Sequence, residues 1–194
     1  MEKMRVESFK LLKKHFDEII SLTEEEFEYA ASYFRPKKLK KHQFLVQEGQ
    51  QSVTEHFVAS GLVKAYYTTV EGKEHILQFA MENWWVTDYH AFYHQAIATT
   101  NIDCIEDCTL LCISQQDKDH ICNKIHKLEY FFRVKSNNGY VALQRRILSL
   151  LNQDAKGRYE EFIKLYPKLV QRIPKTILAS YLGVSRETLS RLGR

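Results

Sequence analysis

The 194 residues suffice for one large domain or for a medium and a small one, and 44% apolar residues, with 12% aromatic, are ample for a hydrophobic core. No apolar run approaches the roughly 20 residues that cross a bilayer, and four cysteines without a secretory signal are more typical of reduced thiols than of a disulfide framework. These features, with a net charge of only +4, exclude a membrane-spanning protein and a disulfide-rich secreted scaffold and predict a folded, cytoplasmic protein.

The N-terminal part of the chain predicts two helices followed by a β-roll. Apolar residues recur at helical spacing over residues 6–20, and Thr23 with Glu26 forms a capping box that starts a second helix. The pattern then changes to short runs rich in aromatic and β-branched residues, separated by turn signals at Gly49, Gly61 and Gly72. The clearest runs cover residues 44–46, 56–59, 62–67, 75–79, 102–105 and 109–113. Strands spaced by about ten residues predict a sandwich or barrel.

A long helix follows. Residues 128–152 contain no proline and a single glycine, which predicts a helix of about six or seven turns. Its apolar residues form two adjacent stripes, one of Phe131, Val134, Val141 and Leu148 and one of Leu143, Ile147, Leu150 and Leu151. Two stripes indicate two partners, namely the chain's own β-roll and a second copy of the helix in a parallel, coiled-coil-like contact. Because Lys135, Asn138 and Arg145 interrupt the seam, a helix buried in a monomer is the alternative.

The last twenty residues have the spacing of a helix-turn-helix. Its apolar positions are Leu178, Leu182, Val184, Leu189 and Leu192. Ala179 is small enough for close approach of the two helices, and Gly183 suits the turn between them. The segment 155–157 should end the long helix, residues 158–166 should form another helix, and Pro174 suits the first position of the helix that follows.

The second helix of this pair carries side chains that can bond base edges. Ser185 can cap it, Thr188 lies in its first turn, and its surface presents Arg186, Glu187, Ser190 and Arg191. Residues 126–194, which include Lys175, hold 14 Lys and Arg against 5 Asp and Glu, whereas residues 1–125 hold 14 against 19. A basic C-terminal third on an acidic chain is typical of a module that contacts phosphates. The alternative is an ordinary helical hairpin in which Glu187 and Arg191 pair only with each other.

This order of elements resembles the catabolite-activator and fumarate-nitrate regulator (Crp/Fnr) family of bacterial transcription factors. Residues 44–49 and 58–64 are similar to the family's strand, hairpin and SGxVK turn, and residues 185–191 are similar to its SRETxxR recognition helix. The resemblance implies an α+β fold with a cyclic-nucleotide-binding-like jelly roll at residues 1–126, a dimerisation helix at 127–153 and a helix-turn-helix DNA-binding domain at 154–194. We therefore expect a homodimeric, sequence-specific regulator that pairs through residues 128–152 and binds double-stranded DNA, with RNA polymerase as a further candidate partner.

The family's nucleotide site is incomplete in this chain. Members that bind cyclic nucleotides hold the ribose with a Gly-Glu pair and the phosphate with an Arg-Ser/Thr-Ala run, where this chain has WWVTDYH at residues 84–90 and ATTN at residues 98–101. The phosphate arginine is absent, so we expect neither cyclic AMP binding through the usual contacts nor a resident cofactor. A different small-molecule effector is expected in a pocket lined by Trp84, Trp85, Asp88, Tyr89, His90, Thr99 and Thr100. The alternative is that the tryptophans only plug the old cavity.

The sequence gives weaker support to two metal-like patterns and to two other functional classes. Cys104, Cys108 and Cys112 recur every four residues, which on paired strands predicts buried thiols and not a metal site. His90 and His94 offer two ligands, with Asp88 as a possible third, but no metalloprotease motif is completed. The His-x-His set of a cupin-type oxygenase is missing, so no enzyme is predicted. A regulatory or protein-interaction module with weakened DNA binding is the alternative function, because Gly193 interrupts the final helix and the sequence stops at Arg194.

Overall fold

The computed structural model describes residues 2–51 and 53–192. Within them, eight antiparallel strands form two facing sheets of four strands. One sheet has the order β1 (Arg35–Leu39), β8 (Cys108–Ile113), β3 (Glu55–Ser60) and β6 (Trp85–Val86). The other has the order β2 (Phe44–Val46), β7 (Asn101–Cys104), β4 (Val63–Thr68) and β5 (Glu74–Ala80). A short helix, α3 (Tyr89–His94), connects β6 to β7.

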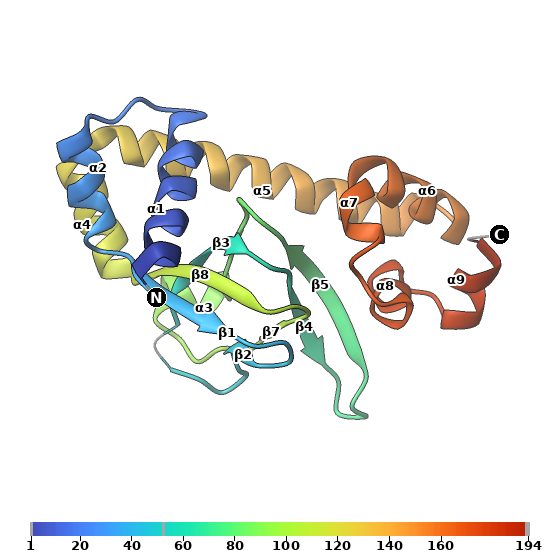
Figure 1. Ribbon diagram of the computed structural model, residues 1–194. Coiled ribbons are helices and arrows are strands. Elements are labelled where there is room, and N and C mark those ends of the chain that lie inside the picture. Colours follow the sequence, from blue (N-terminus) through green and yellow to red (C-terminus); the bar gives the residue numbers. More distant parts are fainter. Residues whose placement is uncertain (1, 52, 193–194) are drawn as a thin grey trace.

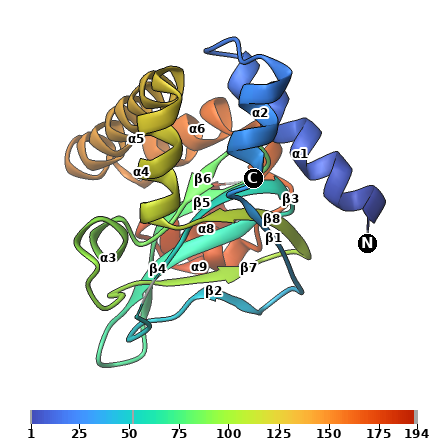
Figure 2. The same ribbon diagram turned by 90° about the vertical axis from the view of Figure 1, so that its left-hand side faces the viewer.

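The remaining helices gather at the two ends of one long helix, α5 (His126–Asn152), as Figure 1 shows. Around its beginning lie α1 (Glu2–Asp17), α2 (Glu24–Ala31) and α4 (Gln115–Lys124), and Figure 2 shows these helices beside the β-roll from a second direction. After its end come α6 (Ala155–Leu165), α7 (Pro167–Val170), α8 (Lys175–Leu182) and α9 (Arg186–Leu192). We call these last four helices the C-terminal head. Among the described residues, no helix is long and apolar enough to cross a membrane.

Apolar side chains form three clusters that explain this arrangement. Val58 belongs to the cluster between the two sheets. Phe57 and Phe131 belong to a second cluster, in which the outer face of the β1–β8–β3–β6 sheet packs against α1, α2, α4 and the start of α5. Phe79 and Leu178 belong to a third cluster, which joins the outer face of the other sheet to the C-terminal head. Each sheet is therefore covered on its outer face by a different part of the chain.

The predicted mixed fold and its main elements are confirmed. The Thr23 hydroxyl accepts the Glu26 N–H at 3.2 Å and the Glu26 carboxylate accepts the Thr23 N–H at 2.9 Å, as in the expected capping box. All six predicted strand runs overlap observed strands. The sequence reading missed β1, which is basic and exposed, and β6, which is two residues long. Neither strand has the apolar alternation by which strands are recognised.

Two predicted boundaries were wrong by one to three residues. The break after α5 lies at residues 153–154, not at 155–157, because Asp154 caps α6 and accepts the Gly157 N–H at 2.8 Å. Gly157 therefore lies in the first turn of α6 and does not end a helix. Pro174 directly precedes α8 and is not its first residue.

Candidate nucleic-acid interface and sensor segment

The helices α8 and α9 pack against each other through a tight turn. Gly183 ends α8 with a φ of +69°, a left-handed conformation that favours glycine, and the Val184 N–H donates to the Ala179 carbonyl at 3.0 Å. Leu178, Ala179 and Leu182 of α8 and Leu189 of α9 are buried in the same cluster. Val184, also predicted to join the two helices, is partly buried against this cluster, whereas the fifth predicted residue, Leu192, is half-buried at the end of α9.

The start of α9 is capped by Ser185. Its hydroxyl accepts the Thr188 N–H at 3.1 Å and lies 3.2 Å from the Thr188 hydroxyl. The guanidinium of Arg191 donates to the Thr188 hydroxyl at 3.4 Å. The backbone N–H of Glu187 and the Ser185 hydroxyl lower the pKa of the Glu187 carboxyl, so this side chain is an acceptor at neutral pH.

Four polar side chains of α9 point away from the core. Arg186, Glu187, Ser190 and Arg191 are all exposed, whereas Thr188 is half-buried and Leu189 is buried. Lys175, at the start of α8, and Lys168, on α7, are exposed as well. The arrangement leaves two guanidinium groups, a carboxylate and a hydroxyl free to meet an external partner. Gly193 and Arg194, on which the prediction of a weakened DNA end rests, lie outside the described residues.

The second half of α5 has an uncovered apolar face. Only Leu128, Phe131 and Phe132, near its beginning, are buried on the chain's own core. Large exposed side chains further along the helix are Tyr140, Val141, Leu143, Ile147, Leu148, Leu150 and Leu151. Val141, Leu148 and Glu161 line part of a hollow of about 370 Å³ between α5 and α6. The expected packing of one whole stripe on the chain's own β-roll was therefore wrong, because apolar side chains of α5 are buried only in its first turns. Its second half meets the roll through Arg146, which donates to the Ile76 carbonyl.

Asp88, just before α3, accepts hydrogen bonds from five donors in its own chain. One carboxylate oxygen accepts the Ala91 N–H at 3.0 Å and caps α3. The other accepts the N–H groups of Thr99 and Thr100 at 2.8 and 3.0 Å and lies 3.2 and 2.9 Å from their hydroxyls. Burial alone would raise the pKa of Asp88, but these donors lower it overall. We call Asp88, Thr99 and Thr100 with their hydrogen bonds the Asp88 cradle.

The other predicted pocket residues do not converge on one cavity. Trp85 is buried in the cluster beneath the helices, where its indole N–H donates to His15 at 3.2 Å, whereas Trp84 packs toward the C-terminal head with its ring 5.6 Å from that of Tyr166. Tyr89 is exposed on α3 and stacks on Tyr93. His90 is exposed on the same helix. The two tryptophans thus face opposite sides of the sheet, Trp84 from the position directly before β6 and Trp85 from its first residue.

The metal-like patterns have structural explanations. Cys104, Cys108 and Cys112 are free thiols in the cluster between the sheets. The rings of His90 and His94 lie 5.1 Å apart on α3, but the carboxylate that the sequence offered as a third ligand is engaged in the Asp88 cradle. Among the described residues, no group of three or more side chains is arranged to hold a metal ion.

Asp88→Asn should destabilise the protein by about 2–3 kcal/mol, because the amide nitrogen of the new side chain would leave backbone N–H groups that are buried or partly buried without an acceptor. Asp154→Asn is the matched control, since an exposed asparagine caps a helix about as well as aspartate does. Urea denaturation at pH 7 measures both. The folded-state pKa of Asp88 lies below the ordinary value of 3.8, so its contribution is present above that pH and is lost as the pH falls through the folded-state pKa. Equal effects of the two substitutions, or a pH-independent difference, would contradict this.

Comparisons with known proteins agree with the architecture. Residues 36–124 match the family described as the cyclic nucleotide-binding domain. The chain is 26% identical over 176 residues to the fumarate and nitrate reduction regulatory protein of Vibrio cholerae, which covers 81% of this chain and 67% of that protein.

Solved structures extend the likeness to the order of domains. The c-di-GMP responsive global regulator CLP of Xanthomonas campestris matches with a TM-score of 0.72 and 16% identity, covering 88% of this chain and 89% of CLP. The match to FixK2 of Bradyrhizobium japonicum has a TM-score of 0.71 and 14% identity and covers 82% of each chain. The chain therefore has the fold of these regulators, with a cyclic nucleotide-binding domain at residues 36–124.

One group of charged residues in this protein escaped the sequence analysis. Arg172, between α7 and α8, binds Glu82 and Glu106 of the β-roll. Its partners lie 90 and 66 residues away along the chain. A single arginine in a link between helices has no local signal that would have revealed them.

Proposed function

We propose that this protein is a transcription regulator of the Crp/Fnr family: a homodimeric, sequence-specific DNA-binding protein of the cytoplasm, in which α9 reads base edges in the major groove. The observation that carries the proposal is the exposure of Arg186, Glu187, Ser190 and Arg191 on a capped helix whose other face is buried against α8. Arginine suits the O6 and N7 atoms of guanine, and glutamate suits the N4 amine of cytosine. Lys175 and Lys168 are suited to phosphates. Contact with RNA polymerase stays a prediction.

The exposed face of α5 supports a dimer formed by two copies of this helix. Leu148 is 50% exposed and Leu151 is 74% exposed, and burying such side chains against their copies would remove apolar surface from water. A parallel pairing of α5 would place one C-terminal head on each side of a twofold axis. Two recognition helices related in this way can enter successive major grooves, about 34 Å apart.

The proposal is tested by selecting bound duplexes from a random pool and titrating the best one against bulk genomic DNA. We expect a preference of at least about a thousandfold, which is typical of specific protein–DNA recognition. A protein that binds the selected duplex and genomic DNA equally would be a protein-interaction module with weakened DNA binding, and the proposal would be wrong.

The Asp88 cradle argues against cyclic AMP as the effector. Thr99 and Thr100 lie where the family's phosphate-binding run is expected, but their donors already serve the carboxylate of Asp88, and Ala98 stands in place of an arginine. A cyclic phosphate there would meet a like charge without a cation to pair it. We therefore expect isothermal titration calorimetry to detect no binding of cyclic AMP at micromolar concentrations. Micromolar affinity would show that the cradle opens and that this part of the proposal is wrong.

A further inference from the structure

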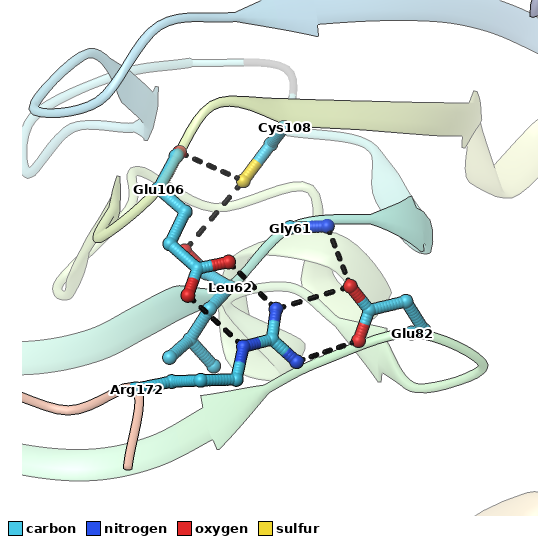
Figure 3. Close-up of polar contacts among 6 residues, drawn as sticks. All are labelled: Gly61, Leu62, Glu82, Glu106, Cys108 and Arg172. Carbon is cyan, nitrogen blue, oxygen red and sulfur yellow. Dashed lines mark hydrogen bonds and ion pairs between the residues drawn. The ribbon is translucent and has the colours of Figure 1, made fainter. Parts of the chain in front are cut away.

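Arg172 joins the C-terminal head to the β-roll by two ion pairs that share one guanidinium (Figure 3). Its Nη1 and Nη2 donate to the Glu82 carboxylate at 2.8 and 3.0 Å. Its Nε and Nη2 donate to the Glu106 carboxylate at 2.9 and 2.6 Å. Each carboxylate thus receives two hydrogen bonds, the geometry that makes arginine pairs both strong and directional. We call Arg172, Glu82 and Glu106 the Arg172 clasp.

The carboxylates of the clasp are held in place by neighbouring turns of the β-roll. Glu82 accepts the Gly61 N–H at 2.8 Å, and the thiol of Cys108 donates to the carbonyls of Glu106 and Leu62 at 3.2 and 3.5 Å (Figure 3). Gly61 has a φ of +99°, and a Cβ there would lie 2.5 Å from a backbone oxygen of the β7–β8 turn. The turns are therefore tightly packed, and together they form a rigid receptor for the guanidinium.

An apolar contact accompanies the clasp. Phe79 of β5 and Leu178 of α8 belong to the cluster that joins the roll to the head, and the Ser180 hydroxyl donates to the Glu74 carbonyl of β5. Arg146 of α5 donates to carbonyls of both parts, that of Ile76 at 2.7 Å and that of Tyr181 at 3.0 Å. Apolar burial is not directional, whereas paired ion bonds are. The apolar cluster can attach the head to the roll, whereas the directed contacts, among which the clasp has the most hydrogen bonds, restrict its orientation.

The partial exposure of the clasp indicates that it restricts the orientation of the head more than it stabilises the fold. The side chains of Arg172, Glu82 and Glu106 are 25%, 37% and 35% exposed, so water screens their charges in part. This screening weakens the ion pairs, so they contribute less to the free energy of unfolding than their bidentate geometry would in a fully buried site. Their four directed hydrogen bonds still exclude most rotations of the link that carries Arg172.

We propose that Arg172 is a positioning residue for DNA binding, and that the clasp holds the head in the orientation that presents α9 to DNA. This inference rests on the proposed DNA-binding function. We expect the clasp to promote DNA binding and not to inhibit it, because the polar side chains of α9 stay exposed while the head is docked. An inhibitory contact would cover these side chains, which are Arg186, Glu187, Ser190 and Arg191. A head held in place has less orientational freedom to lose when both subunits bind DNA.

The clasp also lies close to the Asp88 cradle along the chain. Strand β7 begins directly after Thr99 and Thr100 of the Asp88 cradle and runs into the turn that carries Glu106. One short strand therefore separates the cradle from the clasp.

Two variants separate orientation from charge. Arg172→Gln removes the guanidinium, and the double variant Glu82→Gln/Glu106→Gln keeps it but removes its charged acceptors. We expect both to bind the selected duplex about five- to tenfold more weakly, with unchanged base preference. If only charge mattered, removal of two carboxylates should strengthen DNA binding. Weaker binding of the double variant would therefore result from a changed orientation of the head. Lys164→Gln, at an exposed position of α6, is the control that matches Arg172→Gln in charge.

Hydrogen–deuterium exchange of the free protein supplies a readout that does not depend on DNA. In Arg172→Gln, amides of α8 and of β5 should exchange faster, because these elements face each other across the docked contact. Amides of α4 and of the first turns of α5 should not change, whereas a general loss of stability would accelerate exchange in these helices as well.

The possible outcomes distinguish this inference from the function on which it rests. If the wild type binds its selected duplex and Arg172→Gln resembles Lys164→Gln in both affinity and exchange, the clasp does not position the head. Tighter binding by the double variant would also overturn the proposal, because the clasp would then be a restraint. If the wild type prefers no duplex, the proposed function fails, and the positioning role fails with it.

Discussion

Leu148→Glu should convert the protein from a dimer to a monomer. Leu148 is 50% exposed at the middle of the uncovered apolar face of α5, and in a parallel pair the two substituted carboxylates would face each other across the seam. Two like charges would have to be desolvated without a partner, which costs far more than the apolar contact contributes. Light scattering or analytical ultracentrifugation at micromolar concentration should show the mass of one chain, where the wild type shows two.

The same variant should lose most of its affinity for DNA. Each monomer keeps only one recognition helix, so the second half-site no longer benefits from a tethered partner, and the loss should reach about a hundredfold or more. Ile97→Glu is the matched control, because Ile97 is similarly exposed, at 54%, but lies after α3, away from α5. A dimeric Leu148→Glu protein would show that the subunits pair elsewhere. A monomeric Ile97→Glu protein would show that the interface includes the segment after α3.

Arg186→Ala should relax base preference at one position of each half-site. The exposed guanidinium at the start of α9 can make two hydrogen bonds to guanine, and their loss should cost about 1–3 kcal/mol on the preferred base and little on the other three. Fluorescence anisotropy on duplexes that carry each single-base change measures the preference. Lys175→Ala should instead weaken binding to all duplexes alike and reduce the salt dependence, as expected for a phosphate contact. Uniform weakening by Arg186→Ala would refute its reading role.

The sequence predicted the elements whose signals are local. The capping box at Thr23, the cap at Ser185 and the turn at Gly183 each depend on residues within a few positions, and each forms as expected. The order of helices, β-roll, long helix and helical pair was predictable for the same reason, because hydrophobic periodicity reports which face of an element is buried.

Contacts between distant segments were not predictable. The seven residues expected around one pocket include Trp84 and Trp85, which point to opposite sides of the sheet and join different clusters. The five hydrogen bonds of Asp88 and the clasp of Arg172 bring together segments that no local pattern connects. Likewise, the stripes on α5 reveal apolar faces but not how far along the helix the roll extends.

The symmetry of the selected DNA motif tests the central claim most directly. If two copies of α9, related by pairing of α5, enter successive major grooves, duplexes selected by the wild type should share two inverted half-sites whose centres are about 10 base pairs apart. Substitution of Leu148 should remove this symmetry, and substitution of Arg186 should blur the same base in both halves. A selected motif without inverted repeats, or no shared motif, would contradict the account.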